Sequence, residues 1–151
     1  MNTKKFFIGT LAGGITFFFL GYLIYGVALL GFFSQNTIAP PGSMKQMSEL
    51  VWWALILGNL ASGALLSYIF LKLGNIGSFG SGASTGAAIG FFVTLSMDLI
   101  QYATENSLGR KARLVDVLVG IVMYAVAGGV IGALIGRGKT RSEERRVGKE
   151  C

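Results

Sequence analysis

The sequence predicts an all-α membrane protein, a single antiparallel bundle of four transmembrane helices with glycine-rich packing, over residues 1–140. Of 151 residues, 52% are hydrophobic and only 13% are charged, whereas a soluble domain carries about 25% charged residues. Four apolar runs each reach the ~20 residues that are needed to cross the hydrocarbon core of a bilayer. The segments between the runs are short, which favours helices that lie antiparallel to their neighbours.

The first predicted span covers about residues 6–33, "FFIGTLAGGITFFFLGYLIYGVALLGFF", and contains no charged residue. It follows two lysines, as the apolar region of a signal peptide would, but it is too long for one and no small-residue cleavage pattern follows. We therefore expect a retained anchor. The second span covers about residues 50–71 and begins beside Trp52 and Trp53, whose rings are typical of the headgroup level.

The third and fourth spans are predicted at about residues 82–103 and 114–135. The segment 34–49 holds both prolines of the chain and is the longest expected loop, whereas 72–81 and 104–113 are short connections. Helices joined this briefly are expected to pack side by side, in an up-down-up-down order.

Positive charges give the expected orientation. With the N-terminus inside, five basic residues lie on the inner side and four on the outer side, a small positive-inside bias. The inner set is Lys4, Lys5, Lys72, Arg137 and Lys139, and the outer set is Lys45, Arg110, Lys111 and Arg113. We expect a multi-pass protein of the bacterial inner membrane with both termini inside.

The last segment, "RSEERRVGKEC" at residues 141–151, resembles the translation of a sequencing-library adapter. We interpret it as a non-native tail and leave it out of the fold argument. Without it, the Lys and Arg count falls from 13 to 9 and the Asp and Glu count from 7 to 4, so the net charge is +5.

Composition argues against several classes of function. The chain has no histidine, which removes the commonest general base and metal ligand, and its one cysteine is Cys151. We therefore expect no enzyme activity, no catalytic residue, no metal site and no cofactor. The tyrosines are interpreted as packing and interface residues (Tyr25, Tyr68, Tyr102 and Tyr124). The basic residues flank apolar runs without interleaved aromatics, so a nucleic-acid partner is not expected.

The stretch "GSGASTGAAIG" at residues 80–90 has two interpretations. A dinucleotide-binding turn would need a preceding strand and a βαβ unit, and the sequence around it predicts neither. Read at every fourth position, Gly82, Gly86 and Gly90 form a small-residue face, which lets membrane helices approach closely. Glycine is also simply frequent in membrane helices, and that plainer interpretation stays open.

The fourth span carries a matching row with the same spacing: Asp116, Gly120, Tyr124, Gly128, Gly132 and Gly136. Antiparallel register places Gly82 level with Gly132, Gly86 with Gly128, Gly90 with Tyr124, Thr94 with Gly120, and Asp98 with Asp116. A row at this spacing drifts about 40° per step around a helix, so the glycine ends can touch while the aspartates splay apart. Similar rows occur in the first span (Gly9 and Gly13) and in the second (Ala54, Gly58 and Ser62).

Asp98 and Asp116 lie inside apolar spans, where a charged side chain costs about 2.5–3.5 kcal/mol to insert and usually faces a partner. Asn59 is expected at a similar depth. The two carboxylates either bind a cation or relay a proton, or they are neutralised by Arg113 and Arg110 in a polar clamp that fixes helix register. The sequence leaves both interpretations open.

Four segments together, "FFLGYLIYGVALLGFF", "ALILGNLASGALLSYIFLKLG", "GASTGAAIGFF" and "RLVDVLVGIVMYAVAGGVIGALIG", resemble the small four-helix bacterial membrane proteins grouped as domain of unknown function 1761. The resemblance covers most of residues 6–136. The aromatic-proline step that follows the first helix in that family is replaced here by "IYGV" at residues 24–27. The resemblance implies four spans and no known activity.

The expected function is that of a structural or interaction protein, whose glycine faces pack its own helices or those of a partner. The alternative is a small ion- or proton-coupled transporter or channel component that uses Asp98 and Asp116. The expected partner is the lipid bilayer, with a homo-oligomer or another membrane protein as a further option.

Overall fold

The computed structural model describes residues 2–40, 45 and 47–147, with side chains as far as Gly136. Four helices are long and apolar enough to cross a membrane: Thr3–Ala28, Trp52–Leu73, Phe79–Thr104 and Arg110–Gly136. The predicted all-α class with four membrane-length helices is confirmed.

The first span ends earlier than predicted. Helix α1 (Thr3–Gly21) is capped by Asn2, whose side chain accepts a hydrogen bond from the Lys5 backbone N–H at 3.2 Å. The helix continues into a π-helical segment, η1 (Tyr22–Ala28). Leu29 then leaves the helical region with φ −110° and ψ 8°, and a separate short helix α2 (Leu30–Asn36) follows. The prediction of one span to residue 33 was wrong because hydropathy is uniform across this break.

The other helices lie close to their predicted bounds. A short 3₁₀ turn, η2 (Met47–Glu49), precedes α3 (Trp52–Leu73), and α3 ends at Gly74, whose φ of 71° suits a residue without a Cβ. Helix α4 (Phe79–Thr104) starts three residues earlier than predicted, because Ser78 and Ser81 form a reciprocal capping box. Helix α5 (Arg110–Val147) extends beyond its membrane-length part.

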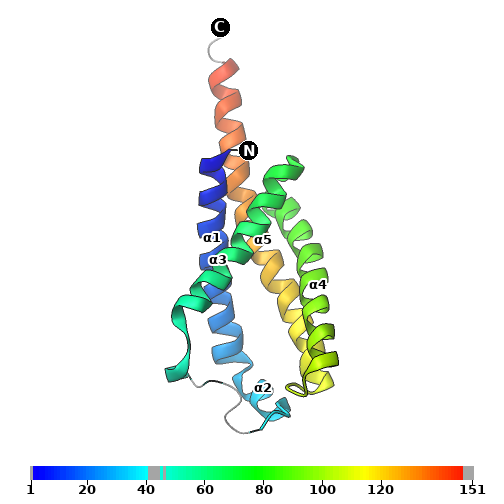
Figure 1. Cartoon of the computed structure of the whole chain (residues 1–151). Helices are drawn as coiled ribbons and strands as arrows, with labels where there is room; N and C mark the ends of the chain where they lie inside the picture. Colours follow the sequence, from blue (N-terminus) through cyan, green and yellow to red (C-terminus); the bar gives the residue numbers. More distant parts are fainter. Residues whose placement is uncertain (1, 41–44, 46, 148–151) are drawn as a thin grey trace.

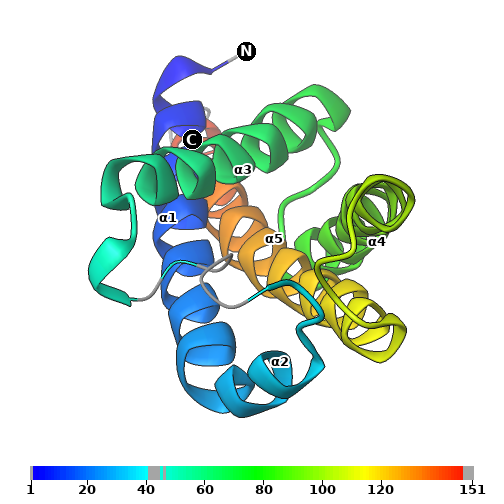
Figure 2. The same cartoon turned by 60° about the horizontal axis from the view of Figure 1, so that its bottom comes forward.

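The helices pack in the spatial order α3, α1, α5, α4. Helix α4 makes its main contact with α5, α3 with α1, and α1 joins the two pairs through α5. In Figure 1, α3 crosses α1 at an angle and α4 runs alongside α5, and Figure 2 shows α3 over α1 with α4 beside α5. The expectation that α3 and α4 pack together because residues 74–78 join them was therefore wrong, since each helix packs on a different partner.

The core lies where α1, α3 and α5 meet. It is built from buried apolar side chains (Phe17, Leu66, Phe70, Ile76, Tyr124, Ala127, Ile131 and Ile135). The Phe17 and Tyr124 rings meet edge to face with their centroids 4.8 Å apart. Most other large apolar side chains face outward, as expected where the surrounding medium is lipid.

Two loops are hydrogen-bonded at one end of the bundle. Ile38 donates its backbone N–H to the Ser107 carbonyl at 2.9 Å, and Gly109 donates to the Asn36 carbonyl at 2.9 Å. These bonds surround an isolated bridge between Thr37 and Leu108. The turn between α4 and α5 is therefore attached to the segment after α2.

Candidate functional site

The backbones of α4 and α5 approach closely along the glycine rows. A Cβ built at Gly82 would collide with the Gly128 carbonyl, and one built at Gly86 would collide with the Tyr124 carbonyl. A Cβ at Gly90 would lie 2.5 Å from the Tyr124 Cβ, and the space beside Gly120 is filled by Thr94. The added Cβ atoms at Gly82 and Gly86 would also lie 3.1 Å from Gly132 Cα and 3.2 Å from Gly128 Cα, which are the pairs expected from the sequence. These glycines therefore have no room for a side chain.

Other glycines named from the sequence also lie in contacts between elements. A Cβ at Gly132 would lie 2.5 Å from the Ser78 carbonyl oxygen, and Gly136 packs against Gly77 in the connection before α4. On α1, Gly9 packs against Ser67 of α3, and Gly13 lies between Ile131 of α5 and Gly63 of α3. The small residues of the first span therefore bring α1 close to both α3 and α5.

The close packing of α4 on α5 places Asp98 beside Arg113. An Arg113 Nη1 atom lies 3.8 Å from Asp98 Oδ1 and donates a hydrogen bond to the Asp98 backbone carbonyl at 3.1 Å. Both residues are buried, each with 6% of its surface exposed. The structure therefore brings together one of the charge pairs that the sequence left open.

Arg113 also binds the end of α4. Its second terminal nitrogen donates to the Glu105 carbonyl at 3.3 Å and contacts the Ser107 hydroxyl at 3.4 Å. Its guanidinium lies 5.7 Å from the centroid of the Tyr102 ring. A positive charge at a helix C-terminus is favourable, because the last carbonyls have no partner within the helix.

Asp116 of α5 has a different partner. Its Oδ1 accepts a hydrogen bond of 2.6 Å from the hydroxyl of Tyr25, which lies in η1 at the end of the first span. Asp116 follows Arg113 by three residues, about one turn of α5, so the two side chains lie on the same side of that helix. Three of the membrane-length helices therefore contribute to one group of polar side chains, Tyr25, Asp98, Arg113 and Asp116, which we call the polar cluster.

The polar cluster is not fully satisfied by hydrogen bonds. Asp98 Oδ2 and Arg113 Nε are buried without a hydrogen-bond partner among the described residues. Within the same part of the chain, Arg110 is exposed and forms no ion pair with Asp98 or Asp116. Of the two arginines expected to neutralise the aspartates, Arg113 therefore forms the ion pair with Asp98.

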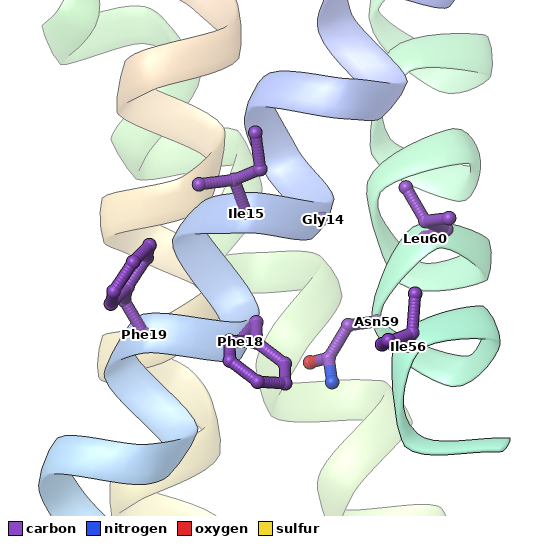
Figure 3. Close-up of a pocket in the computed structure, with 7 residues that line it drawn as sticks. All are labelled: Gly14, Ile15, Phe18, Phe19, Ile56, Asn59 and Leu60. Atoms are coloured by element: carbon purple, nitrogen blue, oxygen red, sulfur yellow. The ribbon is translucent and has the colours of Figure 1, made fainter. Parts of the chain in front are cut away.

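Asn59 does not join the polar cluster. It lies on α3 and its side-chain amide donates to the Leu55 carbonyl of its own helix at 2.8 Å. Figure 3 shows Asn59 between Phe18 of α1 and Ile56 of α3, at the edge of an apolar crevice of about 240 Å³. Asn59 also lines, together with Tyr25, a larger hollow of about 740 Å³, so its expected grouping with the aspartates stays a prediction.

Two larger hollows lie near the polar cluster. One of about 740 Å³ opens between the end of the first span (α1 and η1) and the start of α3, and its lining includes Tyr22, Tyr25 and Trp52. The other, of about 330 Å³, is a groove between α4 and α5 that is lined by Asp98 and Arg113. The polar cluster therefore lies between an aromatic cavity and a groove on the outside of the helix pair.

Sequence reasoning missed two features. Tyr25 was interpreted as a packing residue, yet it is the hydrogen-bond donor to Asp116. The two residues are 91 positions apart in the sequence, so no local pattern could predict the contact. On α3 the packed glycine is Gly63, whose added Cβ would lie 2.6 Å from the Thr10 carbonyl oxygen, whereas a Cβ at Gly58 would meet no described atom within 4 Å. Gly58, the middle residue of the expected row, therefore lies away from the contact between helices.

Comparison with known proteins adds no assignment. Within the described residues, no group of three or more acidic, histidine or cysteine side chains could hold a metal ion. A scan of family models, a search of curated proteins and a search of solved structures each found no match to this chain.

Proposed function

We propose that this chain is a structural or interaction protein of a bacterial inner membrane. The observation that supports it most directly is that Arg113 is occupied by intrachain contacts. It holds the Asp98 carboxylate and also the carbonyls of Asp98 and Glu105. A side chain used in this way fixes the end of one helix against the start of the next.

The backbone contact between α4 and α5 supports the same proposal. A Cβ at Gly86 or Gly128 would meet backbone atoms of the facing helix, so a solute has no path between these two backbones. In lipid, such contact stabilises helix pairs through van der Waals packing, because apolar burial gives little driving force there. The α4–α5 hairpin is then a rigid unit that anchors the rest of the bundle.

The orientation with both termini inside is part of the proposal. Arg113 is buried in the polar cluster, so it contributes little as a free charge of the outer loop. Without Arg113, the outer side carries three basic residues instead of four, against five on the inner side. This larger difference favours the arrangement with the N-terminus inside. The resemblance to the domain of unknown function 1761 proteins is compatible with this proposal and adds no activity.

Reconstitution tests the proposal against transport. We expect the purified full chain in proteoliposomes to leave proton and K⁺ flux at the level of protein-free vesicles. Asp98→Asn should leave flux unchanged and lower the free energy of unfolding, because Arg113 loses its carboxylate, a loss of about 3–5 kcal/mol for a buried pair. Glu49→Gln, which changes an exposed acid outside the cluster, is the matched control.

A second candidate function is proton or cation transfer at the polar cluster. It is favoured by one observation: the polar cluster holds two carboxyls, Asp98 and Asp116, with the Arg113 guanidinium beside Asp98 and the Tyr25 hydroxyl on Asp116. Acidic side chains that face the interior of a helix bundle in a membrane commonly belong to proton or ion pathways. Tyr25 would then connect the carboxyl pair with the cavity between α1 and α3.

The same vesicles distinguish the two functions. Flux above the protein-free level that Asp98→Asn and Asp116→Asn both abolish, while Glu49→Gln does not, would establish the transport function and contradict the structural one. Flux that is equal in empty vesicles, wild type and all variants would contradict the transport function.

A further inference from the structure

The groove between α4 and α5 combines basic and apolar residues in a definite order. Arg110, Arg113 and Tyr102 line the end that lies at the helix termini, and Leu95, Leu99, Leu114 and Val117 line the part that leads toward the middle of the span. From Arg110 to Val117 the helix rises about 10 Å, at 1.5 Å per residue. The groove therefore runs from the headgroup level into the hydrocarbon level.

The groove is open sideways. Leu99 and Leu114 are 57% and 69% exposed, so they face the bilayer. An occupant can therefore enter from the lipid phase and does not need to pass through the protein. An acyl chain has the right chemistry for this apolar part, since apolar surface and hydrocarbon are compatible media.

The charges at the end of the groove favour an anion. Among the lining residues there are two arginines and one carboxylate, that of Asp98. The Asp98 carboxylate is only 6% exposed and its Oδ1 faces Arg113, whereas Arg110 is exposed. A guanidinium donates hydrogen bonds to phosphate oxygens in a fixed planar geometry.

We propose that this groove binds an anionic phospholipid, with its phosphate at Arg110 and one acyl chain along Leu99 and Leu114. Basic pockets between transmembrane helices are suited to anionic headgroups. Glu105, the nearest exposed acid on the turn, does not line the groove. The proposal is independent of whether the polar cluster moves protons.

Native mass spectrometry of the delipidated full chain tests the proposal with phosphatidylglycerol and phosphatidylcholine of equal chain length. We expect the wild type to prefer the anionic lipid, and Arg110→Gln to weaken its binding about fivefold, the equivalent of about 1 kcal/mol per basic residue at a membrane surface. Arg110→Lys should restore part of the affinity. Lys111→Gln is the matched control, because this neighbouring charge is exposed and does not line the groove.

Two further arms separate a bound lipid from a bound soluble anion and from general surface charge. Leu99→Ser should weaken the binding of phosphatidylglycerol. Soluble glycerol phosphate should bind the wild type more weakly than the lipid does. Glycerol phosphate binding as tightly as the lipid would establish a soluble-anion site and overturn the proposal. An equal loss in Arg110→Gln and Lys111→Gln would indicate general surface charge and would also overturn it, as would equal binding of the two lipids by the wild type.

Discussion

Arg113 shows how one residue can organise the end of a membrane hairpin. Its planar guanidinium reaches the Asp98 carboxylate and carbonyl, the Glu105 carbonyl and the Ser107 hydroxyl. Lysine carries the same charge, but it lacks the forked geometry that serves several acceptors at once. The arginine at this position therefore has a structural meaning that charge alone does not explain.

Replacement of Arg113 should destabilise the protein strongly. Arg113→Gln leaves the buried Asp98 carboxylate without its cation, so we expect the free energy of unfolding to fall by about 3–5 kcal/mol. The free energy of unfolding of Arg113→Lys should lie between that of Arg113→Gln and that of the wild type. Unfolding in mixed detergent micelles, followed by circular dichroism, measures the difference.

Arg110→Gln is the control for that series, because Arg110 is exposed and its loss should change stability by less than about 0.5 kcal/mol. Equal stability of Arg113→Gln and Arg110→Gln would show that the ion pair with Asp98 contributes nothing to the fold.

Tyr25 is the second residue with a specific role. Tyr25→Phe removes the 2.6 Å hydrogen bond to Asp116 and keeps the ring. We expect a loss of about 1.5–3 kcal/mol, which is the range for a hydrogen bond to a charged group. The same unfolding titration measures it, with Tyr68→Phe as control, since Tyr68 is 47% exposed on α3. A Tyr25→Phe protein as stable as the control would remove Tyr25 from the polar cluster.

At the level of single elements, the contact between α4 and α5 depends on glycines that have no space for a methyl group. The four-residue spacing keeps these glycines toward the facing helix, and the close backbone approach places Asp98 beside Arg113. At this end of the two rows Asp98 is held by Arg113 and Asp116 by Tyr25.

Two glycine-to-alanine changes should have opposite effects. Gly86→Ala places a Cβ against the Tyr124 backbone, so we expect a loss of about 1–3 kcal/mol from overpacking. Gly58→Ala adds the same group where no described atom lies within 4 Å, and the higher helix propensity of alanine should stabilise α3 by up to about 1 kcal/mol. Thermal unfolding in detergent compares the two. A Gly86→Ala protein at least as stable as Gly58→Ala would contradict the close contact of α4 with α5.

For the molecule as a whole, the order of helices in space differs from their order in the chain. The connection between α3 and α4 joins helices that pack on different partners, whereas the turn between α4 and α5 is held by Arg113 and by the bridge to Thr37. The two connections should therefore respond differently when they are lengthened.

An insertion of Gly and Ser residues tests this difference. Placed after Asn75, which is exposed, the insertion should cost little, because each doubling of a flexible loop costs only about 0.6 kcal/mol. Placed after Asn106, it should cost more than about 2 kcal/mol, since it separates the bonds of Arg113 to Glu105 and Ser107. The free energy of unfolding is the measurement. Equal costs at both positions would contradict the role of Arg113 in holding the turn between α4 and α5.

Particular residues show how far the sequence could be used for prediction. The spans and the α4–α5 register followed from hydropathy and from glycine spacing, since both patterns are periodic along a single helix. The end of α1 was placed too late because Leu29 breaks the helix within an apolar run. The hydrogen bond from Tyr25 to Asp116 was missed, because it depends on how distant helices pack.

Sequence alone was enough to establish that four apolar segments form membrane-length helices and that two of them carry matching small-residue faces. These properties follow from local composition and from the helical period. The packing of the helices was needed to establish that α3 lies on α1, that Tyr25 binds Asp116 and that Arg113, not Arg110, pairs with Asp98. Every such segment is apolar enough to pack against any other, so side-chain shape and a few polar contacts between helices select one arrangement.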